Sequence, residues 1–153
     1  MRMQCEVVVS LEPETPAAIE ELCEKAAGSF DGRSVDLAFL FFSNHHAEHI
    51  ADIIPHLKKK LSPRVLLGCS CQGIIAGARE VETTPGMCLW IAHLPATELV
   101  PFHLNFGKKD EGVAVSGWPK EKMAAYDGQV DALTTLVLAD PFSTPVSDLL
   151  VFL

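Results

Sequence analysis

The chain has 153 residues, of which 48% are hydrophobic, and this length and composition predict a single domain over residues 1–153 with a substantial core. Twenty acidic against 12 basic side chains give a formal net charge of −8, which repels a phosphate backbone and excludes nucleic acid as an expected partner. The five cysteines are odd in number and no signal peptide precedes them, so we expect a cytoplasmic protein. The apolar runs are too short to span a bilayer, so we expect no membrane contact.

A short strand and a helix are the first expected elements. Residues 7–9 are a β-branched run, which is typical of a strand. A proline-rich segment then introduces a helix, with Thr15 as the expected N-cap and Pro16 as the first helical residue. The apolar spacing continues to about Ala27, and Gly28 is expected to close the helix.

The next segment predicts a βαβ unit. Residues 37–42 are a continuous apolar run, as in a strand that is covered on both faces. Ser43 or Asn44 is expected to cap the helix that follows, and Ser62-Pro63 to end it. Residues 65–67 form the second strand.

The remainder of the chain predicts further strands and a last helix. After a loop over residues 69–77 we expect strands at 87–92 and 98–106, a long connection over 107–131, a buried strand at 133–139 and a helix that begins at Thr144-Pro145. The predicted fold class is therefore α/β: a mixed sheet with a βαβ unit followed by antiparallel strands, and with helices packed on the sheet. The last helix would stop uncapped after about two turns, so we expect the chain to be incomplete at its C-terminal end.

Four side chains of the second helix fall on one stripe, about 120° from its apolar stripe. They are His45, His49, Asp52 and His56. A metalloprotease motif would need glutamate at position 46, which is His46, so no catalytic metal is expected. Solvated histidines are the ordinary explanation, and a non-catalytic metal site of His45, His49 and Asp52 stays open. His46 points toward the sheet, as a hydrogen-bonded core residue or as a pocket residue.

The segment after the second strand of the βαβ unit is a candidate binding surface. Cys69 and Cys71 lack the two-residue spacing of redox or zinc cysteine pairs, and no motif places a base beside Cys69 or Ser70. Because the carboxyl ends of both strands open on one edge, Ser43-Asn44 and residues 68–73 are expected to be neighbours, beside the electropositive start of the second helix. Gly68 and Gly73 would either admit a ligand close to the backbone or form a tight turn.

Three segments resemble the FIST N domain family. They are DLAFLFFS at 36–43, VLLGCSCQGII at 65–75 and LADPFS at 138–143. The family has a hydrophobic strand that leads into G-C-S-small-x-G, and an Asp-Pro-Phe segment that introduces a later helix. The resemblance covers about residues 35–150. It departs at Cys71 and Gln72, where the family tends to have Thr and Ala, and at Ile74, which replaces a commonly acidic residue.

The resemblance implies a sensory domain of bacterial and other signal-transduction proteins that binds small molecules such as amino acids. We expect no enzyme activity and no cofactor, and the resemblance implies a C-terminal FIST domain or other signalling domain as partner in the full protein. Two alternatives stay open: an enzyme with a Cys or Ser nucleophile at 68–73, and an interaction module without ligand. The expected ligand-binding residues are Ser43, Asn44, His46, Gly68, Cys69, Ser70, Cys71, Gly73 and Asp140.

Overall fold

The computed structural model describes residues 2–108, 113–124, 134–140 and 142–152. The chain divides into two compact units, Met1–Leu99 and Val100–Leu153. The expectation of a single domain over residues 1–153 stays a prediction.

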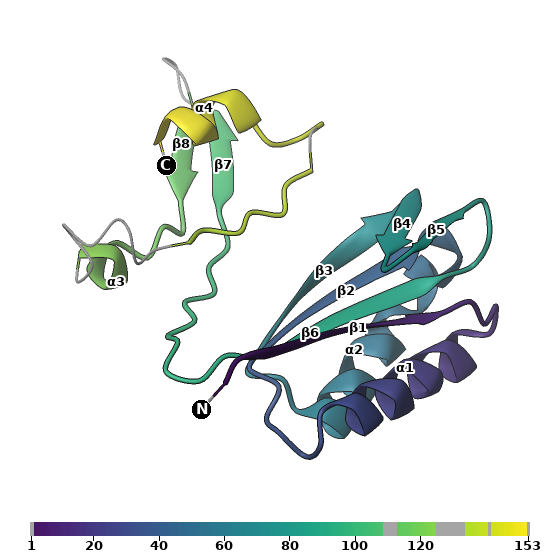
Figure 1. The fold of residues 1–153 in the computed structure, drawn as a ribbon. Coiled ribbons are helices and arrows are strands. Elements are labelled where there is room, and N and C mark those ends of the chain that lie inside the picture. Colours follow the sequence, from purple (N-terminus) through teal and green to yellow (C-terminus); the bar gives the residue numbers. More distant parts are fainter. Residues whose placement is uncertain (1, 109–112, 125–133, 141, 153) are drawn as a thin grey trace. The chain divides into compact units, whose positions relative to one another are not determined.

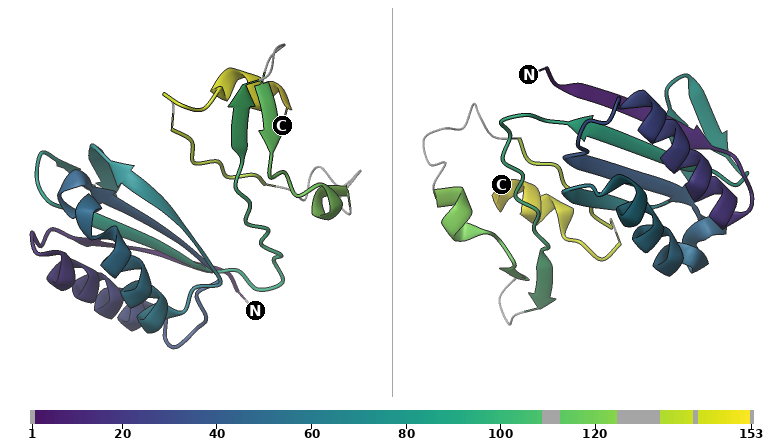
Figure 2. Two further views of the ribbon diagram at one scale, coloured as in Figure 1. Left: turned by 180° about the vertical axis from the view of Figure 1, so that it is seen from behind. Right: turned by 90° about the horizontal axis from the view of Figure 1, so that it is seen from below.

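The first unit is a four-stranded sheet with helices on one face (Figures 1 and 2). Its strands are β1 (Gln4–Ser10), β2 (Leu37–Ser43), β3 (Val65–Cys71) and β6 (Met87–His93), in the spatial order β1-β6-β2-β3. Strand β3 is parallel to β2, whereas β6 lies antiparallel to both β1 and β2. Helices α1 (Thr15–Ser29) and α2 (Ile50–Leu61) cover the sheet. The βαβ unit and the mixed α/β fold are thus confirmed.

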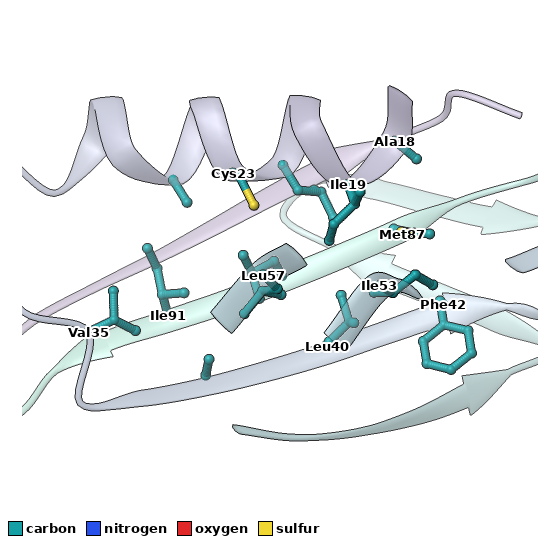
Figure 3. Packing of buried hydrophobic residues seen from close by; sticks show 14 of the residues in the cluster. Ala18, Ile19, Cys23, Val35, Leu40, Phe42, Ile53, Leu57, Met87 and Ile91 are labelled. Atoms are coloured by element: carbon teal, nitrogen blue, oxygen red, sulfur yellow. The ribbon is translucent and has the colours of Figure 1, made fainter. Parts of the chain in front are cut away.

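The core lies between the helices and the sheet. Alternate residues of each strand face the helices, and the apolar stripes of α1 and α2 meet them, as Figure 3 shows for Ile19, Leu57 and Ile91. The other face of the sheet carries smaller clusters around Phe39 and Cys88. A hairpin of β4 (Gly73–Ala76) and β5 (Arg79–Glu82) packs its buried Ile74, Ala76 and Val81 beside Cys88. Strand β2 is apolar from Leu37 to Phe42 because both of its faces are covered.

The strand directions give the sheet two functionally different edges. The carboxyl edge holds the last residues of β1, β2 and β3, namely Ser10, Ser43 and Cys71. The amino edge holds the first residues of β2 and β3 together with His93 at the end of β6. Helix α1 and the helical segment after β2 both start from the carboxyl edge.

Helix α1 differs from the prediction at both ends. The N-cap residue is Glu14 rather than Thr15, and Thr15 is the first residue of the helix. The Thr15 hydroxyl is bound to His46 instead, so it does not cap the helix. Gly28 lies inside the helix, which continues to Ser29 with the buried Phe30 as its C-cap residue.

The predicted second helix begins as a different structure. A 3₁₀ helix, η1 (Asn44–His49), precedes α2 (Ile50–Leu61). Neither Ser43 nor Asn44 provides a side-chain cap, because no such hydrogen bond forms and the Ser43 hydroxyl accepts the N–H of Gly86. A tighter i to i+3 pattern then satisfies the first backbone groups. Ser62 ends α2 in the left-handed conformation, as a C-cap.

The predicted loop over residues 69–77 is wrong. Strand β3 continues to Cys71 because it pairs residue by residue with β2 up to Ser43. Residues 73–76 are then strand β4 of the hairpin. Gly68 permits this close pairing, since a Cβ atom there would lie 2.0 Å from the carbonyl oxygen of Leu40.

The second unit contains a two-stranded sheet, β7 (Asn105–Lys108) with β8 (Val113–Ser116), and helices α3 (Lys120–Ala124) and α4 (Val146–Phe152). Helix α4 confirms the helix predicted after Thr144-Pro145. The strand predicted at 98–106 is wrong, because only its last two residues belong to a strand. The connection predicted over 107–131 contains β7, β8 and α3 in its described parts, and residues 109–112 and 125–131 lie outside the described residues.

The buried strand predicted at 133–139 is also wrong for its described part. Residues 134–139 are irregular, and Leu136, Val137 and Leu138 are exposed. A continuous apolar run becomes a buried strand only when neighbouring strands and covering helices flank it. Among the described residues no helix is long and apolar enough to cross a membrane.

Candidate functional site

The predicted site residues of the first unit gather at the carboxyl edge, but they lie on different faces of the sheet. Ser43 pairs with Cys71, which confirms that the ends of β2 and β3 are neighbours. Side chains alternate along a strand, so Ser70 lies on the helix-covered face with Phe42, whereas Cys69 and Cys71 lie on the opposite face with Phe41. The sheet therefore separates the two cysteines from Ser70.

Several predicted ligand contacts have structural partners. Ser43 is 8% exposed, its N–H donates to the Gly86 carbonyl at 2.9 Å, and its hydroxyl accepts the Gly86 N–H at 3.1 Å. Gly68 serves strand pairing, as described above, and Gly73 opens β4 with only ordinary contacts around it. Asn44 is exposed at the start of η1.

Asp140 belongs to the second unit. Its carboxylate accepts the N–H of Phe142 at 3.1 Å and the hydroxyl of Ser143 at 2.5 Å. These hydrogen bonds, that of Ser143 first, lower the pKa of Asp140. The residue thus orders the turn that precedes α4.

His46 is the buried residue of η1, and its side chain is fully covered. Its Nδ1 atom lies 2.9 Å from the hydroxyl oxygen of Thr15, and its Nε2 atom has no partner among the described residues. Burial, together with the neighbouring His45 and His49, lowers the pKa of His46 from 6.5. The imidazole is therefore neutral at neutral pH. Of the two alternatives left open by the sequence, the structure agrees with the hydrogen-bonded core residue, because His46 is bound to Thr15 and is not among the residues that line the cleft.

A cleft of about 450 Å³ lies beside this pair, between the start of α1 and the segment formed by η1 and α2. Thr15 lines the cleft and so connects it to His46. The stripe predicted from the sequence, His45, His49, Asp52 and His56, forms the opposite wall. The exposed Glu14 contributes a carboxylate on the α1 side. The residues that line the cleft are Pro13, Glu14, Thr15, Pro16, Ile19, His45, His49, Asp52, Ile53 and His56.

The cleft offers imidazole and carboxylate groups. His45 and His49 supply imidazole nitrogens, and Asp52 supplies a carboxylate on the same helical segment. His56 is already engaged, because its Nε2 lies 2.7 Å from Glu20, which also binds Lys60 at 2.6 Å. The hydrogen bonds from Lys60 and His56 lower the pKa of Glu20. The other polar side-chain groups of the lining, those of His45, His49, Asp52 and Glu14, have no hydrogen-bond partner among the described residues.

The histidines and carboxylates of the cleft can be compared with the requirements of a metal site. In the part of the chain that the structure describes, no three His, Cys, Asp or Glu side chains are placed to hold a metal ion. The His45, His49 and Asp52 set, which stayed open from the sequence, is therefore not assembled as a metal site here. A second hollow of about 360 Å³ lies between α2 and β3, and its wall is mainly aliphatic with Lys58 as the charged group.

Sequence reasoning missed a polar network at the amino edge. The carboxylate of Asp36, which is 5% exposed, accepts the Leu94 N–H at 2.7 Å and an Arg64 N–H at 3.1 Å. His93 Nδ1 lies 3.4 Å from Asp36 and 3.1 Å from the carbonyl oxygen of Ser34. Burial opposes ionisation, but the Leu94 hydrogen bond, Arg64 and His93 outweigh it and lower the pKa of Asp36. The sequence held one indication of this network, namely that the acidic Asp36 directly precedes the apolar strand β2.

Comparison with known proteins agrees with this architecture. The family model of the FIST N domain matches residues 36–153. Uncharacterized proteins from two strains of Mycobacterium tuberculosis are 32% identical to the chain over 149 residues, and one from Mycobacterium bovis is 30% identical over 149 residues. These matches cover 97% of the chain but 36% of each relative, so the chain spans about a third of their length. No solved structure matches.

The fold and the family match together define the class of the protein as a sensory domain of signal transduction. The chain belongs to the FIST N domain family.

Proposed function

We propose that the chain binds a small zwitterion, such as an amino acid, in the cleft between α1 and the η1–α2 segment, as the input step of a signalling protein. The observation that carries the proposal is the cleft itself, which lies at the carboxyl edge of the sheet and has on its wall imidazole and carboxylate groups that are unpaired within the described part of the chain. Ligands of open α/β sheets bind outside the carboxyl ends of the strands.

The chemistry of the wall fits the two ends of an amino acid. The ammonium group would lie near Asp52 and Glu14, and the carboxylate near His45, His49 and the positive end of the α1 dipole. The volume of about 450 Å³ accommodates a ligand of this size. Two of the ligand-binding residues predicted from the sequence, Asn44 and His46, belong to η1, which forms one wall of the cleft. His46 contributes indirectly, because it holds the hydroxyl of the lining residue Thr15.

A thermal-shift screen of the purified protein against the amino acids tests this proposal. A ligand at a hundred times its Kd should add about 2.7 kcal/mol to the free energy of unfolding. Asp52→Asn should remove most of this gain. Asp31→Asn is the matched control, because it removes the same charge from an exposed residue that does not line the cleft. The absence of any stabilising amino acid, or an equal loss in both variants, would contradict the proposal.

We further propose that the signal passes to a C-terminal FIST domain or another signalling domain of a longer protein in the bacterial cytoplasm. The relatives support this, because they are longer than the matched region. The free thiols of all five cysteines are compatible with a reducing compartment.

A further inference from the structure

The second feature of the carboxyl edge is a pair of thiols on the sheet face that the helices do not cover. Cys69 and Cys71 are two residues apart on β3, and their Sγ atoms lie 3.9 Å apart. Cys69 is exposed and Cys71 is half-buried. Strand β3 is the last strand of the four-stranded sheet, so its outer backbone is unpaired among the strands that the structure describes.

The two thiols have different surroundings. Cys71 packs against the apolar cluster of Ile74, Val81 and Cys88, and its S–H donates toward the carbonyl oxygen of Cys69 at 3.7 Å. Burial first, and then the neighbouring Cys69, raise the pKa of Cys71 to about 11. The rise from 9.0 to about 11 lowers its thiolate fraction at neutral pH about a hundredfold. Cys69 is therefore the accessible nucleophile, and Cys71 is a protonated thiol held beside it.

We propose that Cys69 and Cys71 are a thiol-disulfide switch that a hydroperoxide oxidises. The Cys69 thiolate attacks one oxygen of the hydroperoxide, the O–O bond breaks, and the leaving oxygen takes a proton and departs as water or an alcohol. Cys69 is now a sulfenic acid, oxidised by two electrons that the hydroperoxide has gained. The Cys71 sulfur then attacks the Cys69 sulfur, the S–O bond breaks, and the hydroxyl leaves as water with the Cys71 proton.

The edge position allows the movement that this bond requires. A disulfide needs the two sulfur atoms about 2 Å closer together than they lie here, since an S–S bond is about 2.05 Å long. Strand β3 can bend because only its inner side is held, by β2. Such a strained and exposed disulfide would be readily reduced again, which is the property of regulatory rather than structural disulfides.

Peptide mapping of the purified protein after treatment with hydrogen peroxide tests the proposal. Cleavage after Arg64 and Arg79 yields a peptide, 65–79, that holds Cys69 and Cys71 and none of the other cysteines. After oxidation and alkylation with N-ethylmaleimide, this peptide should be lighter by two hydrogen atoms and unlabelled, and reduction with dithiothreitol should restore two labels. Before oxidation, limited alkylation should modify Cys69 at least about tenfold faster than Cys71, because thiolate is the reacting form.

Two variants separate the steps. Cys71→Ser should stop the reaction at the sulfenic acid of Cys69, which dimedone traps. Cys5→Ser, the control at another exposed cysteine, should still form the disulfide in peptide 65–79, as the wild type does. The proposal is wrong if peptide 65–79 keeps both thiols under peroxide that oxidises Cys5. It is equally wrong if Cys71 is alkylated before Cys69, or if the disulfide joins either cysteine to another site or to a second chain.

Discussion

The two edges of the four-stranded sheet use buried histidines in contrasting ways. At the amino edge, His93 lies beside the Asp36 carboxylate in a polar network with the Leu94 N–H, Arg64 and Ser34, and its Nε2 atom, like that of His46, has no partner among the described residues. At the carboxyl edge, His46 has a single hydroxyl partner, Thr15, and the groups above it line an open cleft. The histidines thus differ in their surroundings: His93 has a carboxylate and an arginine in its network, whereas His46 lies under the cleft in which we place the proposed ligand.

The largest effect is expected at the amino edge. Asp36→Ala leaves the half-buried Leu94 N–H without its acceptor and the buried His93 without its charged neighbour, so it should lower the free energy of unfolding by about 3 kcal/mol. Urea denaturation measures this loss. Arg64→Met is the control and should cost less than about 1 kcal/mol, because the Arg64 side chain is 54% exposed. Equal losses in both variants would show that the network is not held by the carboxylate.

The next largest loss of stability is expected where β2 and β3 pair, between the two edges of the sheet. Gly68→Ala would place a Cβ atom 2.0 Å from the Leu40 carbonyl oxygen, so it should cost about 2 kcal/mol as β3 moves away from β2. Gly28→Ala is the matched control inside α1, where a Cβ atom meets nothing within 4 Å, and it should stabilise the protein by about 0.5–1 kcal/mol. Urea denaturation of both variants checks the opposite signs. A neutral Gly68→Ala variant would mean that the β2–β3 pairing is looser than described.

A smaller effect is expected at the carboxyl edge. Thr15→Val keeps the shape of the side chain but removes the only hydrogen-bond partner that His46 has in the described structure, so it should cost about 1 kcal/mol. It should also weaken the thermal shift produced by a bound amino acid, since Thr15 lines the cleft. Thr84→Val, at an exposed position, is the control and should change neither quantity. A stability loss without any change in ligand response would separate His46 from the cleft.

The pH dependence should be the smallest effect, and it distinguishes the two edges. The folded protein lowers the pKa of His46 below 6.5, so the unfolded chain binds more protons and stability rises with pH. The contribution of His46 is complete above about pH 6.5 and is lost as pH falls toward its folded pKa. The pKa of Asp36 is lowered from 3.8, so its contribution is lost only in more acidic solution.

His46→Gln provides the measurement for this window. Urea denaturation of the wild type and the variant between pH 7 and pH 5 should give a smaller loss of stability for His46→Gln, because glutamine does not titrate in this range. A parallel loss in both proteins would mean that His46 does not carry the dependence.

The sequence by itself determined the elements whose signal is local. The apolar run of β2 and the amphipathic stripe of α2 predicted the βαβ unit, because the periodicity of buried residues follows from the geometry of each element alone. The same reasoning placed His45, His49, Asp52 and His56 on one side, where they do line the cleft. The histidine stripe was thus predictable from residue spacing.

Only the tertiary structure decided which groups meet across the chain. Thr15 binds His46, 31 residues away, and so does not cap its own helix. Pairing with β2 extends β3 to Cys71 and places Ser70 and the two cysteines on opposite faces. Such partnerships depend on hydrogen bonds and strand pairing between distant segments, for which spacing along the chain carries no signal.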